Sequence, residues 1–475
     1  MSRVWITTIA ALDGANNPVT LRFADGAHVD DDANFYEPRM RQPALMRVSA
    51  NGGALLSTGD NSIGEMELIN ADGGLNYLLD YAVDGRKCTI SIVTNGVQVE
   101  YFSGTITKLA ERGNLLRLTL RPSLQMLEAP YPLDTYNRES LKGVYKPVLW
   151  GRVDNAQPLL IDAPLLIYKA CVGNGLISNV RDSGIELVRG ADYTSASEME
   201  TVEPLAGQFR CFHGQFRLGA SPVGLITFDA THDGLTAGKI IKKLLLPFDA
   251  ELCAACEVEL DSIGGQCGIY LTDTNNTMSG ILTKIGEALG FYWFYADGLI
   301  KCKLLAPPVA SGGKTINEWS ILSIERKSTA VGAGGVPVQS VRIPHSLVST
   351  VQEDLATGVT DVLRTKLSQQ WRFSEAESAA TIIRHPLSEK LMIAEGFSFD
   401  STKTDTVANR VLGVLSVRRD SVSVDVQIDA IGPVDIGDSV TVFSRRLGYE
   451  LGRVMICVGY ELDARKNRIK LELFG

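Results

Sequence analysis

The sequence predicts a mainly β fold with an α+β middle and a β domain at each end of the chain. Two observations carry this prediction. Short β-branched or alternating runs, parted by turn residues, fill residues 1–128 and resume near the C-terminus. Apolar residues at helical spacing begin at residue 235. The 475 residues exceed what one hydrophobic core holds, so several domains are expected.

The N-terminal region reads as strands and turns. Val4 to Ile9 are mostly β-formers, so we interpret them as a first strand rather than as a signal peptide. Further strands are MELIN, CTISIVTN, VEYFSGTITKLAER and NLLRLTLR, with a short helix at LNYLLDYA (75–82). Their close spacing is typical of a barrel or a sandwich.

The middle of the chain contains a proline-rich stretch, more strands and then helices. Residues 141–170 are apolar and hold three prolines, too many for a central strand, so a connector is expected there. LLIYKACV, IELVRG, QFRCFHGQFRLG and GLITFDA read as strands. LTAGKIIKKLLL (235–246) and MSGILTKIGEALGF (278–291) read as amphipathic helices, and FYWFYADGLIKCKLL (291–305) as a hairpin.

The last third is expected to contain two linkers, two helices and a final β region. PPVASGGK (307–314) and AVGAGGVP (330–337) resemble linkers, SEAESAATII a polar helix, and TDTVANRVLGVLSVRRD (404–420) a long helix. The closing strands are SVSVDVQIDA, SVTVFSRR, GRVMICVGYELD and RIKLELFG. The domains predicted are 1–128, 129–234, 235–310, 311–399 and 400–475.

The charge and the motifs do not point to an enzyme. A net charge of −9 argues against a basic groove for nucleic acid, and no run reaches the length of a membrane span. SGGKT (311–315) lacks the first glycine of a phosphate loop, and neither Asp30-Asp31-Asp32 nor DTNNT (273–277) completes a calcium loop. The five histidines are scattered, and Ser221 is not in a nucleophile elbow. We therefore predict no catalytic, cofactor-binding or metal-binding residues and no cofactor.

The cysteines are the one constellation with chemical interest. Cys253 and Cys256 are spaced as in metal sites, with Cys267 and Cys302 further along at loose spacing. A zinc or iron–sulfur site stays an alternative. Without an export signal the protein is expected to fold in a reducing cytoplasm, where buried thiols are the default reading of its eight cysteines.

Three stretches together resemble one protein family. They are KPVLWGRVDNAQPLLIDAPLLIYKA with the strands that follow it, GILTKIGEALGFYWFYADGLIKCKLL, and VDIGDSVTVFSRRLGYELGRVMICVGYELDARKNRIKLELFG. In order and pattern they resemble the baseplate hub, or tail tip, proteins of tailed bacteriophages, over roughly residues 40–475.

The resemblance implies a non-enzymatic structural protein of the virion. The tail that it implies is of the long non-contractile kind. It implies a homotrimer in which each chain supplies two tube-like β domains, at 1–128 and about 400–475. The implied partners are the distal tail protein, other tail tip or baseplate proteins, the tape measure protein and tail fibres. DNA would pass through the channel without specific binding, past acidic loops such as Asp30-Asp31-Asp32 or the turns around Asp435 and Asp438. That the net charge of −9 serves only solubility stays an alternative.

Two other classes of function stay open. One is a receptor- or carbohydrate-binding tail component, for which the aromatic run Phe291 to Tyr295 is the candidate, although a hairpin would bury part of it. The other is a tail-associated cell-wall hydrolase, for which the sequence offers neither a paired-acid nor a zinc candidate.

Overall fold

The computed structural model describes residues 3–56, 62–234, 236–296, 298–309, 313–328 and 336–475. The chain divides into two compact units, and both are discontinuous in sequence. Unit 1 comprises residues 1–126, 292–337 and 417–475, and unit 2 comprises residues 127–291 and 338–416. Residues 310–312 of the first predicted linker and 330–335 of the second lie outside the described residues, as do residues 311 and 312 of SGGKT.

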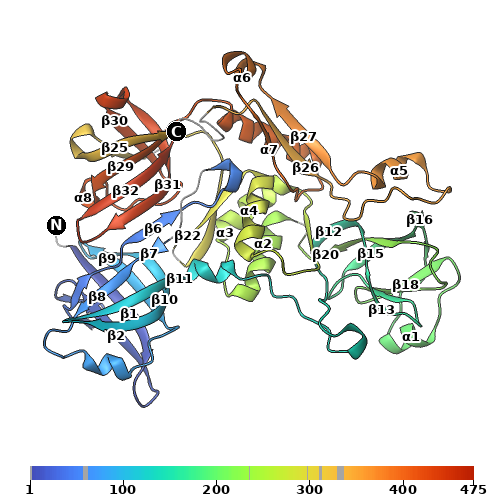
Figure 1. The fold of residues 1–475 in the computed structure, drawn as a ribbon, viewed down its shortest axis with the longest axis horizontal. Coiled ribbons are helices and arrows are strands. Elements are labelled where there is room, and N and C mark those ends of the chain that lie inside the picture. Colours follow the sequence, from blue (N-terminus) through green and yellow to red (C-terminus); the bar gives the residue numbers. More distant parts are fainter. Residues whose placement is uncertain (1–2, 57–61, 235, 297, 310–312, 329–335) are drawn as a thin grey trace. The chain divides into compact units, whose positions relative to one another are not determined.

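Unit 1 contains the strands from both ends of the chain (Figure 1). Its first sheet has seven strands in the order β2-β1-β9-β10-β11-β8-β5. These strands are β1 Arg3–Leu12, β2 Pro18–Ala24, β5 Met40–Gln42, β8 Glu65–Ile69, β9 Lys87–Thr94, β10 Val97–Arg112 and β11 Leu115–Pro122. A single bridge between Phe23 and Glu37 brings the β2 end of the sheet near the residues that lead into β5. The predicted helix at 75–82 is a 3-10 helix, Asn76–Asp80.

The second sheet of unit 1 is built mainly from the C-terminal region. Its main path has the order β24-β30-β31-β32-β29-β25. The strands are β24 Lys314–Ile316, β25 Ile321–Ser328, β29 Ser421–Gln427, β30 Ser439–Ser444, β31 Tyr449–Asp463 and β32 Arg468–Phe474. The N-terminal strands β6 (Met46–Ser49) and β7 (Ser62–Ile63) join it, because β6 pairs with β31. The mainly β prediction is confirmed for both chain ends, while closure of each region into a barrel stays a prediction.

Unit 2 begins with two five-stranded sheets that pack on one another. One has the order β16-β15-β20-β12-β21 and the other β13-β14-β19-β18-β17. The first consists of β12 Val148–Ala156, β15 Leu176–Asp182, β16 Ile185–Glu186, β20 Ile226–His232 and β21 Gly268–Leu271. The second consists of β13 Leu159–Asp162, β14 Ile167–Lys169, β17 Val188–Arg189, β18 Gln208–Phe212 and β19 Gln215–Leu218. Their shared core includes Leu149, Phe209, Phe216 and Phe228.

The prediction that residues 141–170 form a connector without a central strand is wrong. Within this stretch, β12 lies between β20 and β21 and pairs with both. Pro147 and Pro158 stand just outside β12, so neither removes a hydrogen-bond donor from the strand itself. Pro164 lies in the turn between β13 and β14. The prolines delimit strands here rather than exclude them.

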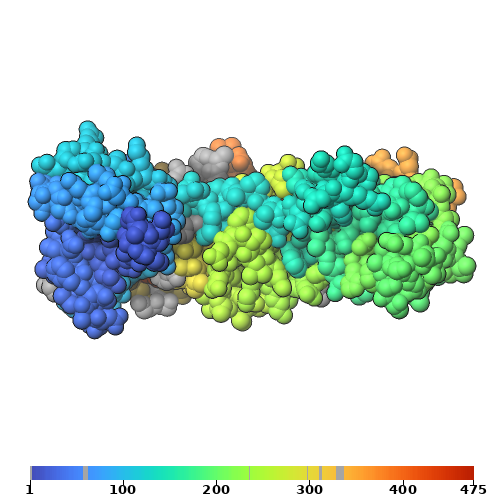
Figure 2. All heavy atoms as spheres, turned by 90° about the horizontal axis from the view of Figure 1, so that it is seen from below, coloured from blue at the N-terminus to red at the C-terminus, as the bar shows by residue number. Residues whose placement is uncertain are grey.

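The helices of unit 2 are mostly where the apolar spacing predicts them. α2 spans Ala237–Leu245 and α4 spans Met278–Leu289, which begins after the N-cap Thr277 and ends at Gly290 in the left-handed conformation. A helix that the sequence analysis did not predict, α3, covers Ala254–Gly264. The space-filling view shows atoms of this α2–α3 region on the surface, where Leu246 and Val258 are 63% and 71% exposed (Figure 2).

The second segment of unit 2, residues 338–416, follows the unit 1 segment 292–337 in the sequence. We call residues 338–416 the returning segment. It contains the three-stranded sheet β27-β26-β28, made of β26 Ser340–His345, β27 Arg372–Glu377 and β28 Lys390–Met392. Its helices are α5 Asp361–Leu367, α6 Ala379–Arg384 and α7 Ser401–Leu415. The prediction of a polar helix at 374–383 is wrong for its first half, where the chain forms β27, and is confirmed for its second half, where the chain forms α6. The long helix predicted at 404–420 starts earlier and ends earlier, capped by the Asp400 carboxylate, which accepts the N–H of Lys403 at 3.1 Å.

The aromatic run at 291–295 is largely buried. Phe291 to Phe294 lie in β22 (Phe291–Ala296) and are between 0% and 3% exposed. Burial rather than display on the surface is thus confirmed for four of the five residues. Across the described ranges, no helix combines the length and the apolar character that crossing a bilayer requires.

Candidate functional site

Two features of the fold could carry function: a junction of two sheets in unit 1 and a polar network in unit 2. The junction is the pairing of β6 with β31. Met46 to Ser49 lie opposite Leu462 to Gly459 in antiparallel register, and the N–H of Ala50 continues the ladder by donating to the carbonyl oxygen of Val458 at 2.8 Å. An N-terminal strand thereby becomes part of the C-terminal sheet.

One continuous set of buried apolar side chains runs through both sheets of unit 1. It includes Trp5, Ile90 and Leu118 of the first sheet together with Val424 and Leu471 of the second. Each of these five side chains is at most 1% exposed. Because burial of apolar area is the main stabilising contribution to a fold, the two sheets are expected to depend on each other for stability.

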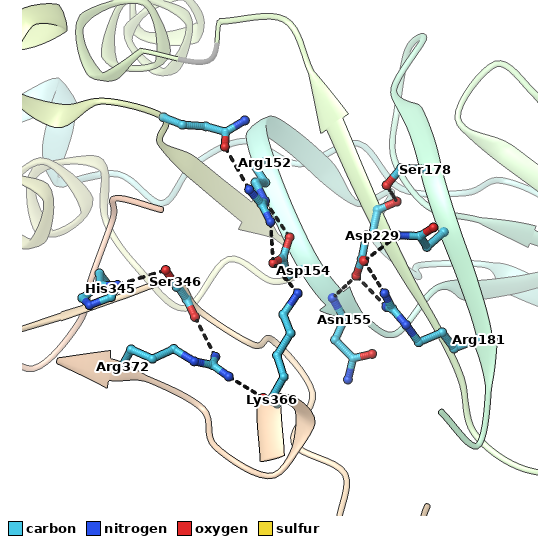
Figure 3. A network of polar contacts seen from close by, with 12 residues as sticks. Arg152, Asp154, Asn155, Ser178, Arg181, Asp229, His345, Ser346, Lys366 and Arg372 are labelled. Atoms are coloured by element: carbon cyan, nitrogen blue, oxygen red, sulfur yellow. Dashed lines mark hydrogen bonds and ion pairs between the residues drawn. The ribbon is translucent and has the colours of Figure 1, made fainter. Parts of the chain in front are cut away.

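The polar network of unit 2 is centred on a buried ion pair (Figure 3). Arg181 of β15 donates two hydrogen bonds to Asp229 of β20, at 2.7 and 2.5 Å. The side chains are 3% and 11% exposed. Asp229 also accepts the backbone N–H of Asn155 at 2.8 Å and the side-chain amide of Asn179 at 3.1 Å. Both carboxylate oxygens are therefore satisfied, as a buried charge requires.

The electrostatics of this pair favour the ionised carboxylate. Burial by itself would raise the pKa of Asp229, but the hydrogen bonds and the positive charge of Arg181 outweigh burial and hold the pKa below the usual 3.8. A carboxylate of this kind is a poor proton donor or acceptor near neutral pH. The pair is thus suited to holding structure rather than to acid–base catalysis.

A bulge in β12 connects the network to the returning segment. The register of β12 against β20 shifts between Val153 and Ala156, and Asn155 has a left-handed φ of 51°. Its side-chain amide donates to the carbonyl oxygen of Thr350 at 2.6 Å and to the side chain of Gln352 at 3.0 Å. In return, the Thr350 N–H donates to the Asn155 carbonyl oxygen at 3.0 Å. The bulge is the attachment point for residues 348–352.

A second ion pair reinforces the same attachment. Arg152 donates to both oxygens of Asp154, at 2.7 and 2.9 Å, and to the side chain of Gln266 at 2.9 Å. Lys366 of α5 also reaches Asp154, at 3.2 Å, and Arg372 donates to the backbone oxygen of Lys366 at 2.7 Å. Asp154 and Asp229 both have cationic partners, so the network ties the returning segment to β12 and presents no unpaired acid from these two residues.

The cysteines of the metal alternative are distributed over both units. Cys253 is the N-cap residue of α3, Cys256 lies buried in that helix, and Cys267 directly precedes β21, whereas Cys302 lies in β23 (Leu299–Leu304) of unit 1. Burial raises the pKa of the Cys267 thiol, which favours the neutral thiol. All eight cysteines lie among the described residues, and none of them is in a disulfide. In the part of the chain that the structure describes, no three His, Cys, Asp or Glu residues are grouped to hold a metal ion.

The acidic residues named from the sequence have local structural partners. Asp30 accepts the N–H groups of Asp32 and Asn34 and the side-chain amide of Asn34, and these bonds, led by that amide, lower its pKa. Asp438 accepts Lys314 at 3.2 Å and the N–H of Asp435 at 3.0 Å. Asp273 of DTNNT accepts the N–H of Asn275 at 2.9 Å. Each of these three carboxylates organises a turn.

No family model matches the sequence, and no curated protein matches it either. Several solved structures are similar to the chain. The 43 kDa tail protein of prophage MuSo2 from Shewanella oneidensis is 10% identical, with 99% of this chain and 96% of that chain covered and a TM-score of 0.43. A tail protein from Neisseria meningitidis is also 10% identical, with 100% and 97% covered and a TM-score of 0.39.

A third similar structure comes from the virion of a native gene transfer agent particle. It is 14% identical, covers 74% of this chain and 91% of its own, and has a TM-score of 0.41. Tail and baseplate proteins are what this chain resembles.

Proposed function

We propose that the chain is the structural hub protein of a phage baseplate, which closes or extends the tip of the tail tube and forms part of the channel for DNA ejection. The observation that carries the proposal is the junction in unit 1. Strands from the two ends of the chain are joined there by β6–β31 pairing and by one continuous core. A chain that supplies two neighbouring β domains to a ring needs such a rigid junction between them.

The assembly follows from the family resemblance in the sequence. Three copies, each supplying two tube-like β domains, would imitate a sixfold ring of the tail tube. The partners would be the distal tail protein, other tail tip or baseplate proteins, the tape measure protein and tail fibres. The protein would be assembled in the host cytoplasm and would end in the virion tail, of the long non-contractile kind.

The role in DNA passage rests on charge. Lysine or arginine side chains along a bore would neutralise phosphates and retain the duplex, whereas carboxylates repel it. The net charge of −9 suits the second case. Repulsion is screened beyond roughly 8 Å at physiological salt, so only carboxylates close to the bore would matter. Turns such as the one at Asp30 are candidates.

The two other classes of function are less well supported. A carbohydrate-binding component would display its aromatic cluster, but Phe291 to Phe294 are buried. A cell-wall hydrolase would need acids that are poised for proton transfer, whereas Asp154 and Asp229 are held as ion pairs. A structural role without enzymatic activity is therefore the one that we propose.

Electron microscopy of the purified protein with its tail partners tests the proposal. Threefold rings with an acidic bore are expected in the images. In a separate binding measurement, the assembled protein is expected not to bind duplex DNA tightly in a salt-sensitive way. A chain that stays a monomer when the tail partners are present would contradict the proposed assembly. A bore rimmed with lysine and arginine would contradict the proposed mode of DNA passage.

A further inference from the structure

The outer edge of β21 in unit 2 is open. β21 is the last strand of its sheet and pairs on one side with β12. On the other side, the N–H of Gly268 donates to the carbonyl oxygen of Phe397 at 3.1 Å, next to a single bridge between Cys267 and Ser398. Beyond Gly268 the two segments separate, and no strand among the described residues continues the pairing.

The open edge has the hydrogen-bonding groups that another strand would use. Backbone groups of successive residues in a strand point alternately to its two sides. Since the Gly268 N–H points away from β12, the N–H and C=O of Tyr270 also point away from it. A row of such groups is a template for an added strand.

Two adjoining hollows make this edge the side of a groove. One, of about 410 Å³, follows Gly268 to Leu271, and the other, of about 550 Å³, continues from Tyr270 to Thr272. Tyr270, Leu347 and Gln370 line both hollows, so the two hollows adjoin each other within unit 2. We call the two together the β21 groove.

The first half of the β21 groove has a partly apolar lining. Ile281 and Ile285 of α4 line it together with Trp371 and Phe397. The charged residues of its lining, Lys284 and Glu395, pair with each other at 2.6 Å. The lining of the second half contains no charged residue and includes prolines and tyrosines. An uncharged occupant with an apolar side chain matches this lining.

We propose that the β21 groove binds an extended, uncharged peptide segment of another protein, which adds a strand to β21. Main-chain hydrogen bonds to the strand edge would supply affinity, and alternate side chains would supply specificity. One apolar side chain would enter the space between Ile281, Ile285 and Trp371. The four residues of β21 correspond to an extended segment of about 13 Å, so a peptide of about four to six residues would fill the groove.

The lining of the groove favours a single peptide strand, without a sheet attached to it, over a second copy of this chain. Besides β21, the groove is lined by Leu347, Gln370 and the residues around Glu395. A second copy would bring its own β21 only together with the rest of a five-stranded sheet. A tail or linker of another protein has no such sheet attached to it. The inference goes beyond the proposed function and does not rest on it, because peptide binding can be measured on the purified chain.

The test uses random twelve-residue displayed peptides selected on the full chain, followed by fluorescence anisotropy with the synthetic consensus peptide. Selection is expected to return segments with alternating apolar residues. The variant Ala394→Trp, at an exposed alanine that lines the groove, should weaken binding of the consensus peptide at least tenfold. The matched control Ala196→Trp, at an exposed alanine that lines neither hollow, should change it less than twofold.

N-methylation of the peptide distinguishes strand addition from other modes of binding. Methylating the amides of one alternate set of residues should abolish binding, and methylating the other set should leave it nearly unchanged. Selection of no peptide, unchanged binding to Ala394→Trp, or equal tolerance of both methylated sets would each overturn the proposal. Self-association that Ala394→Trp abolishes, without peptide binding, would assign the groove to a second copy and would also overturn it.

Discussion

Arg181 and Asp229 form a bidentate ion pair in the interior of unit 2, with hydrogen bonds of 2.7 and 2.5 Å between strands β15 and β20. The arrangement couples two strands of one sheet and, through the N–H of Asn155, a third. Removing one partner of a buried pair leaves the other charge without compensation, which is far more costly than losing a pair on the surface.

We therefore predict that Asp229→Asn lowers the free energy of unfolding of unit 2 by about 3–5 kcal/mol. Urea titration of the full chain, followed by tryptophan fluorescence, measures the change. Asp192→Asn is the matched control, because its pair with Arg189 has a comparable distance of 2.9 Å but side chains that are 32% and 53% exposed. The control should cost about 0–1 kcal/mol. Equal losses in the two variants would contradict a stabilising role of the buried pair.

The same pair predicts how stability depends on pH. Burial by itself would raise the pKa of Asp229, but the hydrogen bonds and charge of Arg181, together with the hydrogen bonds from Asn155 and Asn179, hold this pKa below its usual 3.8 in the folded state. A lowered carboxyl pKa contributes stability that is fully present above the unfolded pKa and is lost as the pH falls through the folded pKa. Between about pH 5 and pH 2, the wild type should thus lose more stability than Asp229→Asn. Parallel curves of unfolding midpoint against pH would show that the pair has no part in acid sensitivity.

The cysteine pair at the start of α3 predicts a mild response to substitution. Cys253 holds the N-cap position, where serine is among the favoured residues, so Cys253→Ser should leave stability unchanged or raise it by up to about 1 kcal/mol. Cys256 is 7% exposed, and serine there should cost about 1–3 kcal/mol through burial of a hydroxyl. The double variant should stay folded, and elemental analysis should find no stoichiometric zinc or iron in the wild type. Stoichiometric metal that the double variant loses while unfolding would support the metal alternative instead.

The β6–β31 junction predicts a specific effect of proline at Val48. The N–H of Ala50 donates to β31, and alternation along β6 directs the N–H of Val48 to the same side. Val48→Pro removes that donor and leaves an acceptor on β31 unpaired, at a cost of about 1–3 kcal/mol. Amide exchange should then rise at residues 458–462 but not in β1 and β9. Val48→Thr keeps the N–H and the shape of the side chain, so its exchange pattern should match the wild type.

Local sequence patterns were sufficient for many elements of the fold. Alternating β-branched residues indicate β1 and β29, and apolar spacing that ends at Gly290 indicates α4. The pattern failed for α3, since the buried residues of this helix are only Cys256, Leu260 and Gly264, a stripe too narrow to read as amphipathic. Proline content over the whole stretch does not indicate β12, because Pro147 and Pro158 flank this strand and neither lies inside it.

The candidate site could not be predicted in the same way. Asp154 meets Lys366 across 212 positions of sequence, and Asn155 meets Thr350 across 195. Nothing local to Asp154 or Asn155 indicates that residues 338–416 return to unit 2 after the excursion through unit 1. Contacts of such long range depend on the tertiary fold, which single-sequence patterns do not specify.

Two glycines that face each other across β12 and β21 supply the last prediction. Gly151 lies opposite Gly268, and a Cβ atom at Gly268 would stand 1.8 Å from the carbonyl oxygen of Arg152. Because that neighbour is backbone, it cannot move aside without separating the strands, so Gly268→Ala should destabilise unit 2 by about 1–3 kcal/mol or more. Gly413→Ala is the control with the opposite sign: it lies in α7 with nothing within 4 Å of its added Cβ, and alanine there should stabilise by roughly 0.5–1 kcal/mol. Urea midpoints that shift in opposite directions would support this close approach of β12 and β21, whereas a stabilising Gly268→Ala would show that the two strands are further apart than the register requires.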